Sequence, residues 1–261
     1  MQLILQHLPG FMLVLCRMSA FFTVAPPFST RGVPARFKAG LSVLISFLVY
    51  QTAGIGQPVE LDGLYLLAVV REILAGLLIG FAAYLFFAVA QTAGSFVDLQ
   101  LGFGMANVVD PLTGVSTPVL GNFKYMFAVL IFLTIDGHHL LLSAAMRSYE
   151  WIPLGKPWLN LFAQGAVTEF LVRTFTDTFL LAFQMSAPLI VSLFLTDVAF
   201  GFLARTAPQF NVFILGLPTK QIIGFLLLLL LTPGLFGLFQ QLYASMIDSL
   251  GRLFAILQSG S

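Results

Sequence analysis

Long apolar stretches constrain this 261-residue chain more than any other feature. A helix needs about 20 apolar residues to cross the hydrocarbon core of a bilayer. Six stretches come near or reach that length: residues 3–24, 39–55, 64–90, 125–146, 170–202, and 221–231 with its continuation. They show no period-two alternation, and a membrane requires each segment to satisfy its own backbone hydrogen bonds. The sequence therefore predicts an all-α, integral-membrane-type protein.

The composition excludes several classes of function. Hydrophobic residues make up 59% of the chain and charged residues only 9%, against roughly 25% charged residues in a soluble domain. The 12 basic and 11 acidic side chains nearly cancel, so we expect no nucleic-acid partner. The single cysteine, Cys16, cannot form a disulfide within the chain or supply a cysteine metal cluster.

Catalytic and cofactor-binding motifs are missing from the sequence. Ser116 lies in a Gly-x-Ser-x-Pro sequence, where a nucleophile elbow needs glycine in the last position. Gly102 and Gly104 are followed by Asn107, where a dinucleotide-binding loop needs a third glycine. We therefore predict that the chain is not an enzyme and has no cofactor.

Asp136, His138 and His139 are the residues that most resemble a metal site. Adjacent histidines on a helix point about 100° apart, and no third ligand stands at helical spacing from them. The sequence therefore predicts no metal site here.

Several charged residues fall inside or beside the apolar stretches, where an unpaired charge is costly. We expect Arg71, Glu72, Asp98, Arg173 and Asp177 to lie at helix interfaces. Arg173 and Asp177 are four residues apart and could pair, although the acid-before-base order is better at that spacing. A satisfied ion pair and a proton or solute relay both remain open.

The segment 102–122 interrupts the helices. Four glycines and two prolines make a continuous helix improbable there, and loops of this length are usually functional or disordered. Apolar side chains nevertheless recur along it: Phe103, Met105, Val108, Val109 and Leu112. A plug that seals a narrow pore and an ordinary loop that caps the bundle are both compatible with this pattern.

The C-terminal part reads as two helices separated by Thr232, Pro233 and Gly234, which we expect to break or sharply bend the chain. Beyond this point, apolar residues at three- and four-residue steps predict an amphipathic helix. Leu242, Met246, Ile247 and Leu250 lie on its apolar stripe and are the residues we expect to pack on a partner. Packing on the chain's own bundle and a water-facing surface are the alternatives.

A set of motifs follows a fixed order along the chain: Ala93-Gly94, Asp98-Leu99-Gln100-Leu101-Gly102, Asn107-Val108-Val109-Asp110-Pro111, Asp136-Gly137-His138-His139, Ser148-Tyr149 with Pro153, Arg205-Thr206-Ala207-Pro208-Gln209-Phe210-Asn211-Val212-Phe213, and Gly216-Leu217-Pro218-Thr219-Lys220. In these motifs and their order the sequence resembles the FliR/SctT family of flagellar and injectisome export proteins. The resemblance covers nearly the whole chain. One departure is Arg71, where the family would have a small residue before the glutamate.

The resemblance implies a subunit of the type III protein export gate in the bacterial inner membrane, at the flagellar basal body. FliP-type and FliQ-type subunits would surround a channel for unfolded flagellar export substrates, with FlhB and FlhA beside it, and membrane lipid would be a further contact. Residues 1–160 would be FliP-like and residues 161–261 a FliQ-like helical hairpin, within one export-gate domain assembled into a helical complex.

The pore-closing loop of that family maps onto residues 102–122. The residues it implies for the plug are Phe103, Gly104, Met105, Asn107, Val108, Val109, Asp110, Pro111, Leu112 and Gly114. The runner-up function is a small secondary transporter, with an ion or solute site formed by Arg173, Asp177 and Asp98. A purely structural scaffold that never touches cargo is the third possibility.

Overall fold

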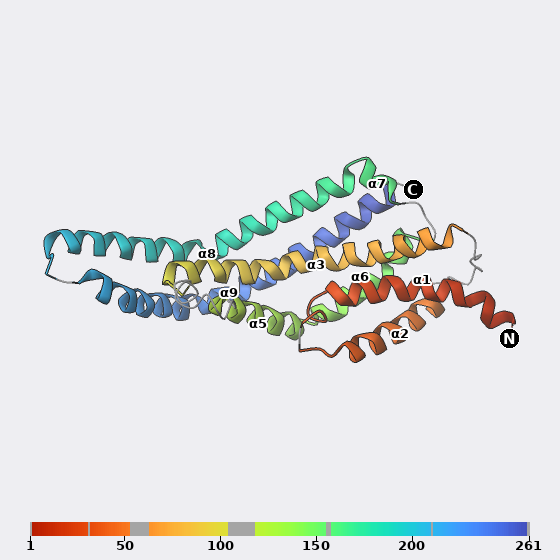
Figure 1. Cartoon of the computed structure of the whole chain (residues 1–261), viewed down its shortest axis with the longest axis horizontal. Coiled ribbons are helices and arrows are strands. Elements are labelled where there is room, and N and C mark those ends of the chain that lie inside the picture. The colour runs from red at the N-terminus through yellow and green to blue at the C-terminus, as the bar shows by residue number, and fades with distance from the viewer. Residues whose placement is uncertain are drawn as a thin grey trace. The chain divides into compact units, whose positions relative to one another are not determined.

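A computed structural model describes residues 2–30, 32–52, 63–103, 118–154, 158–209 and 211–259. Within these ranges every regular element is a helix (Figure 1). The helices are α1 (Gln2–Val24), α2 (Ala35–Thr52), α3 (Tyr65–Leu101), α5 (Val119–Thr134), α6 (Gly137–Trp151), α7 (Asn160–Ala163), α8 (Ala166–Thr206) and α9 (Val212–Ser259). The predicted all-α class is confirmed.

Four of the described helices are long and apolar enough to cross a membrane: α1, α3, α8 and α9. The pair α5 and α6 adds a fifth if it counts as one broken span. The second apolar stretch of the sequence forms α2, an 18-residue helix that begins with Arg36 and Lys38 in its first turn and is not among these candidates. The structure thus supports four or five spans rather than six.

The stretch 125–146 is interrupted where α5 ends and α6 begins. Asp136 adopts a left-handed conformation with φ of 56°, and Gly137 follows it as the first residue of α6. A side chain at position 137 would overlap the ring of Phe132, so only glycine fits this corner. The break therefore depends on Asp136 and Gly137.

The break predicted at Thr232, Pro233 and Gly234 is wrong, because α9 continues through this position to Ser259. Pro233 removes a single backbone donor, and apolar helices of this type tolerate such a loss. Gly234 does not adopt the left-handed conformation that would end the helix. The hairpin lies earlier, where α8 ends at Thr206 and α9 begins at Val212.

The chain divides into two compact units, and each is described by itself. The first comprises residues 1–86, 132–175 and 243–261, and the second residues 87–131 and 176–242. In the first unit α2 runs alongside α1 (Figure 1). There α3 also approaches α1 closely at Gly76, where a side chain would overlap the carbonyl oxygen of Arg17. Small residues at such contacts are typical of apolar helix pairs.

Candidate functional site

The candidate plug segment is described only at its two ends. Phe103 and the residues from Pro118 onward are described, and the remaining predicted plug residues lie outside the described residues: Gly104, Met105, Asn107, Val108, Val109, Asp110, Pro111, Leu112 and Gly114. The structure therefore describes the base of this segment, meaning the end of α3 and the start of α5, which both belong to the second unit.

At the start of the segment, α3 ends in a left-handed glycine motif. Gly102 has φ of 79°, a conformation that glycine adopts without strain. Its N–H donates to the Leu99 carbonyl at 3.3 Å, and the Phe103 N–H donates to the Asp98 carbonyl at 3.1 Å. These two bonds satisfy carbonyls that the end of a helix leaves without partners. The predicted loop start at Gly102 agrees with this geometry.

At the end of the segment, the carboxylate of Asp98 caps α5. The N–H of Leu120 donates to Asp98 Oδ1 at 3.0 Å, and the N–H of Gly121 donates to Asp98 Oδ2 at 3.1 Å. Asp98 is only 5% exposed. A carboxylate at a helix N-terminus satisfies free N–H groups and interacts favourably with the helix dipole. Asp98 therefore lies between α3 and α5, and the partners of its carboxylate are backbone amides.

The backbones of α3 and α5 touch at Gly94 and Gly121. A Cβ atom on Gly94 would lie 2.5 Å from Gly121 N and 2.6 Å from the Leu120 carbonyl oxygen, closer than side-chain atoms pack. A Cβ atom on Gly121 would lie 2.9 Å from the carbonyl oxygen of Gln91. Two glycines are therefore needed to bring the α5 N-terminus within reach of Asp98.

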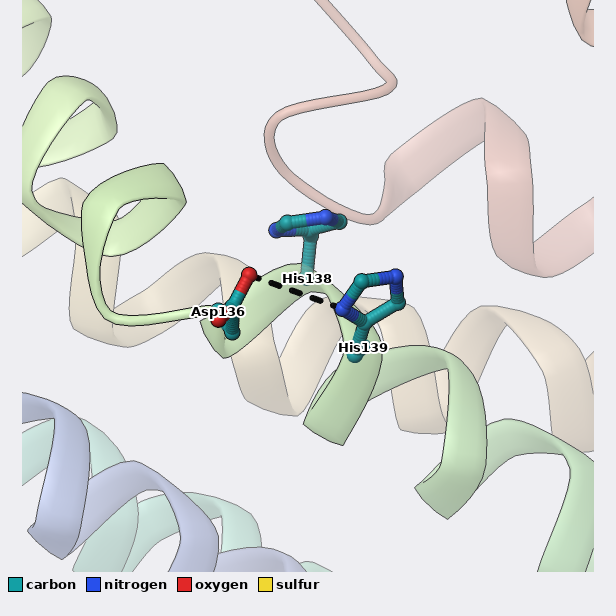
Figure 2. Close-up of side chains that lie close together, drawn as sticks. All are labelled: Asp136, His138 and His139. Atoms are coloured by element: carbon teal, nitrogen blue, oxygen red, sulfur yellow. Dashed lines mark ion pairs between the residues drawn. The ribbon is translucent and has the colours of Figure 1, made fainter.

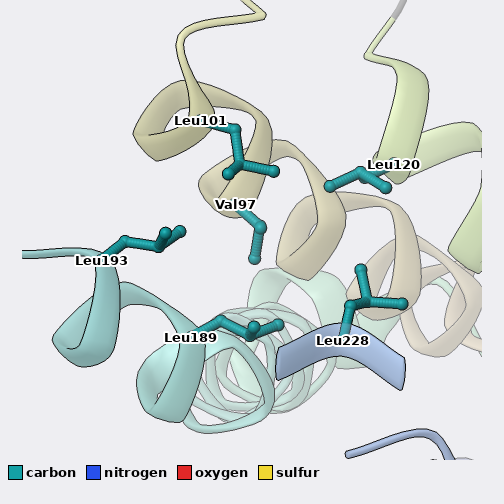
Figure 3. Packing of buried hydrophobic residues seen from close by; sticks show 6 residues of the cluster. All are labelled: Val97, Leu101, Leu120, Leu189, Leu193 and Leu228. Carbon is teal, nitrogen blue, oxygen red and sulfur yellow. The ribbon is translucent and has the colours of Figure 1, made fainter. Parts of the chain in front are cut away.

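A cluster of buried hydrophobic side chains packs between the helices at this base. Figure 3 shows its six buried side chains converging from α3, α5, α8 and α9: Val97, Leu101, Leu120, Leu189, Leu193 and Leu228. Phe103 packs against this cluster, and its ring centroid lies 6.2 Å from that of Phe225. Phe103, one of the predicted sealing residues, is thus half-buried against the chain's own core.

A polar contact that the sequence did not reveal joins α8 and α9 in the same unit. Lys220 Nζ lies 2.6 Å from Asp197 Oδ2, and it also lies 3.5 Å from Gln100 Oε1 on α3. Together with the contact of Leu189 and Leu193 with Leu228, this pair shows that the two helices form an antiparallel hairpin.

In the first unit, Glu72 pairs with a residue that sequence reasoning had not selected. Arg17 Nε donates to Glu72 Oε2 at 2.6 Å, and its Nη2 donates to Glu72 Oε1 at 3.0 Å. The remaining Arg17 donors reach Ser148 Oγ at 3.1 Å and the Ile152 carbonyl at 2.9 Å. The sequence does indicate that Arg17 needs a buried partner, because it is the one charged residue within the stretch 3–24.

Arg173 pairs with Glu169 and not with Asp177, the partner that its spacing also allowed. Arg173 Nη2 lies 2.7 Å from Glu169 Oε1, and both side chains are exposed. The acid precedes the base by four residues in this pair, which is the favoured order on a helix. Asp177 is also exposed, and Arg71 is half-buried on α3.

The corner between α5 and α6 brings Asp136, His138 and His139 closer together than the sequence suggested. One ligand atom from each lies within 4.8 Å of the others, and the two ring centroids are 4.2 Å apart. Figure 2 shows Asp136 facing His139 across the first turn of α6, with Asp136 Oδ1 3.6 Å from His139 Nδ1. Both of these side chains are largely exposed to water, so they do not need an ion to offset a burial cost.

Comparison with known proteins decides the family. The family model described as "Bacterial export proteins, family 1" matches residues 8–246. The chain belongs to this export family. It is 38% identical over 257 residues to the flagellar biosynthetic protein FliR of Bacillus subtilis (strain 168), covering 98% of this chain and 99% of that protein.

Further relatives extend the match to both kinds of export system. The chain is 32% identical to FliR of Escherichia coli (strain K12), covering 93% of this chain and 92% of the relative. It is 29% identical to the Yop proteins translocation protein T of Yersinia pestis, covering 98% of each chain. The resemblance to the FliR/SctT family is confirmed, and the chain is a non-enzymatic component of a membrane export apparatus.

The apolar stripe near the end of α9 in this export protein is mostly buried within the chain itself. Leu242, Met246 and Leu250 are buried within the chain, and Ile247 is half-buried. In this structure these side chains therefore follow the alternative of packing on the chain's own bundle. As placed in this structure, Leu242, Met246 and Leu250 present little surface to a partner.

Much of the apolar surface that this export protein leaves uncovered lies on α8 and α9. Only 11% and 17% of the most apolar stretches of these two helices are buried, against 67% for α3. Large side chains exposed there include Phe175, Phe194, Leu195, Phe202, Ile222, Leu229 and Leu230. Such a surface is typical of a membrane protein or of a subunit that packs on others.

Proposed function

We propose that this chain contributes part of the wall and the plug of a type III protein export gate in the bacterial inner membrane, at the flagellar basal body. The observation that carries this proposal is the base of the 102–122 segment. The apolar helices α3 and α5 are held together there by Asp98, Gly94 and Gly121, and the connection between them carries the apolar residues expected to seal a pore.

The sealing residues remain those that the sequence selected: Met105, Val108, Val109 and Leu112, with Phe103 at the base. Apolar side chains close a narrow pore by excluding water, and an irregular backbone at membrane depth is tolerated where it lines a protein cavity. Gly104, Asn107, Asp110, Pro111 and Gly114 would shape the turn. Phe103 would contribute less than the others because it packs on the leucine cluster.

The partners that this proposal requires are FliP-type and FliQ-type subunits, with FlhB and FlhA beside them. The uncovered faces of α8 and α9 support this view, since they are too apolar for water. Residues 1–160 would correspond to a FliP-like part and residues 161–261, which contain the α8–α9 hairpin, to a FliQ-like part. Unfolded flagellar subunits would be the cargo, and lipid would cover whatever the partners do not.

The transporter alternative gains no support from these residues. Asp98 is occupied by the α5 amides, and Arg173 pairs with Glu169 at an exposed position. Asp98 already has hydrogen-bond partners and Arg173 is exposed, so neither residue is a buried polar group that needs a solute as its partner. A transporter should bind solute as a purified single chain, whereas an export subunit should co-purify with its partners.

The plug is tested by two variants of the assembled complex. In one, residues 104–114 are shortened; in the other, they are replaced by a Gly-Ser linker of the same length. We expect both to assemble and to raise the membrane conductance to ions, because either change removes the sealing side chains. Unchanged conductance in both variants would remove the plug from the proposal. Crosslinking from Met105 or Val109 to a stalled export substrate separates a channel from a scaffold.

A further inference from the structure

Asp98 accepts hydrogen bonds at the C-terminal end of α3 and at the N-terminal end of α5. Its backbone carbonyl accepts the Phe103 N–H, and its carboxylate accepts the N–H groups of Leu120 and Gly121. These three bonds join the last residue described before the plug segment to the first turn of α5. Among the described residues, Asp98 is the one whose hydrogen bonds reach the backbone at both ends of this connection.

Lys124 stands on α5, three residues after Gly121, and it is almost completely buried at 1% exposure. Its Nζ has no hydrogen-bond acceptor among the described residues. Lys124 follows Leu120 and Gly121 on α5 by about one helical turn, and the Asp98 carboxylate that binds those two amides is the acidic group beside it. A buried ammonium is unfavourable unless an opposite charge compensates it, and the attraction is strong where water is excluded.

Asp98 therefore lies beside two positive groups. The positive end of α5 and the Lys124 ammonium both act on its carboxylate. If Asp98 were neutral, one of the two amides would lose its acceptor, and the Lys124 ammonium would lose its counter-charge. If Lys124 were neutral, the two amides would still hold the carboxylate.

We propose that Asp98 is the positioning residue of the plug, with Lys124 as its counter-charge. Asp98 holds together the two ends of the connection between α3 and α5, so that the segment between them starts and finishes at one fixed point. This inference rests on the proposed function for its effect on the pore. The contact itself does not depend on that function.

The test uses Asp98→Asn in the complete complex, with Asp177→Asn as the matched control on an exposed site of α8. Hydrogen exchange of the Leu120 and Gly121 amides reports the contact directly. Ion conductance, normalised to the amount of assembled complex, reports the plug. We expect exchange at these amides to rise at least about tenfold and conductance to rise in Asp98→Asn, with neither changed in Asp177→Asn.

The counter-charge is tested by Lys124→Met and by the double variant Asp98→Asn/Lys124→Met. We expect Lys124→Met to keep the amide protection, and the double variant to assemble at least about threefold better than Asp98→Asn, because no buried ammonium is left uncompensated. A double variant no better than Asp98→Asn would remove Lys124 from the proposal.

The two possible failures are distinguishable. Unchanged amide protection in Asp98→Asn would overturn the positioning role, whatever the conductance does. Faster exchange with unchanged conductance would leave Asp98 as the residue that joins the two helix ends, and it would show that the segment it holds does not seal a pore.

Discussion

Arg17 and Glu72 form a buried ion pair between α1 and α3, with Arg17 Nε 2.6 Å from Glu72 Oε2 and both side chains at most 2% exposed. The guanidinium also lies 4.0 Å from the centre of the Tyr149 ring, and it donates to Ser148 and Ile152 at the end of α6. Three helices therefore meet at one arginine whose donors are directed at four acceptor atoms.

Removing either charge should strongly destabilise the first unit. Glu72→Gln leaves a buried guanidinium without its counter-charge, and breaking such a pair costs about 3–5 kcal/mol. We expect a marked loss of yield and a lower Tm of the purified protein in detergent. The control is Glu169→Gln, which breaks the exposed pair with Arg173 and should cost less than about 1 kcal/mol. Equal effects of the two substitutions would contradict this account.

The sequence could not show which charged residues of the apolar stretches are buried or what they pair with: Glu72 and Asp98 are buried, whereas Arg173 and Asp177 are exposed. Arg17 and Glu72 are 55 residues apart, and no local spacing connects them. By contrast, the pairing of Arg173 was decided by local helix geometry, and the acid-before-base order favoured Glu169 over Asp177. Contacts within one turn follow from the sequence, whereas contacts between helices require knowledge of which faces meet.

The contact of α3 with α5 predicts a sharp difference between two glycines. Gly94→Ala would place a methyl group against the backbone of Gly121, and overpacking of this kind costs about 1–3 kcal/mol or more. We expect a lower Tm and faster hydrogen exchange at the start of α5. Gly40→Ala, in α2, meets nothing within 4 Å and should stabilise by about 0.5–1 kcal/mol. A stabilised Gly94→Ala variant would show that the helices do not touch there.

The burial of the C-terminal stripe predicts that it matters for folding. Leu242 is 3% exposed, and Leu242→Ala should destabilise by about 2–5 kcal/mol through lost contacts and a cavity. Leu238 lies one turn earlier at 40% exposure, and Leu238→Ala should change stability by about 0.5 kcal/mol or less. Thermal unfolding of the chain measures both. If instead Leu242→Ala lowered only the yield of the complex, the stripe would belong to an interface.

Helix continuity was harder to predict than helix existence. The stretches 3–24 and 64–90 were found as α1 and within α3, because length and apolar composition determine them. The break was misplaced in the C-terminal part, since Thr232-Pro233-Gly234 reads as a turn in water but lies inside α9. The corner at Asp136 was missed because no proline marks it. Its cause is a left-handed aspartate followed by a glycine that packs under Phe132.

That corner gives the last prediction. Asp136 has φ of 56°, a conformation that disfavours side chains by about 1–2 kcal/mol, with aspartate among the better tolerated. Asp136→Gly should therefore keep or raise stability by up to about 1 kcal/mol, since its exposed contact with His139 is worth little. Asp136→Val should lower stability by about 1–2 kcal/mol, because a β-branched side chain cannot adopt this conformation without strain. Thermal unfolding of the two variants measures the difference, and a valine variant as stable as the glycine variant would mean that α5 and α6 do not turn at this residue.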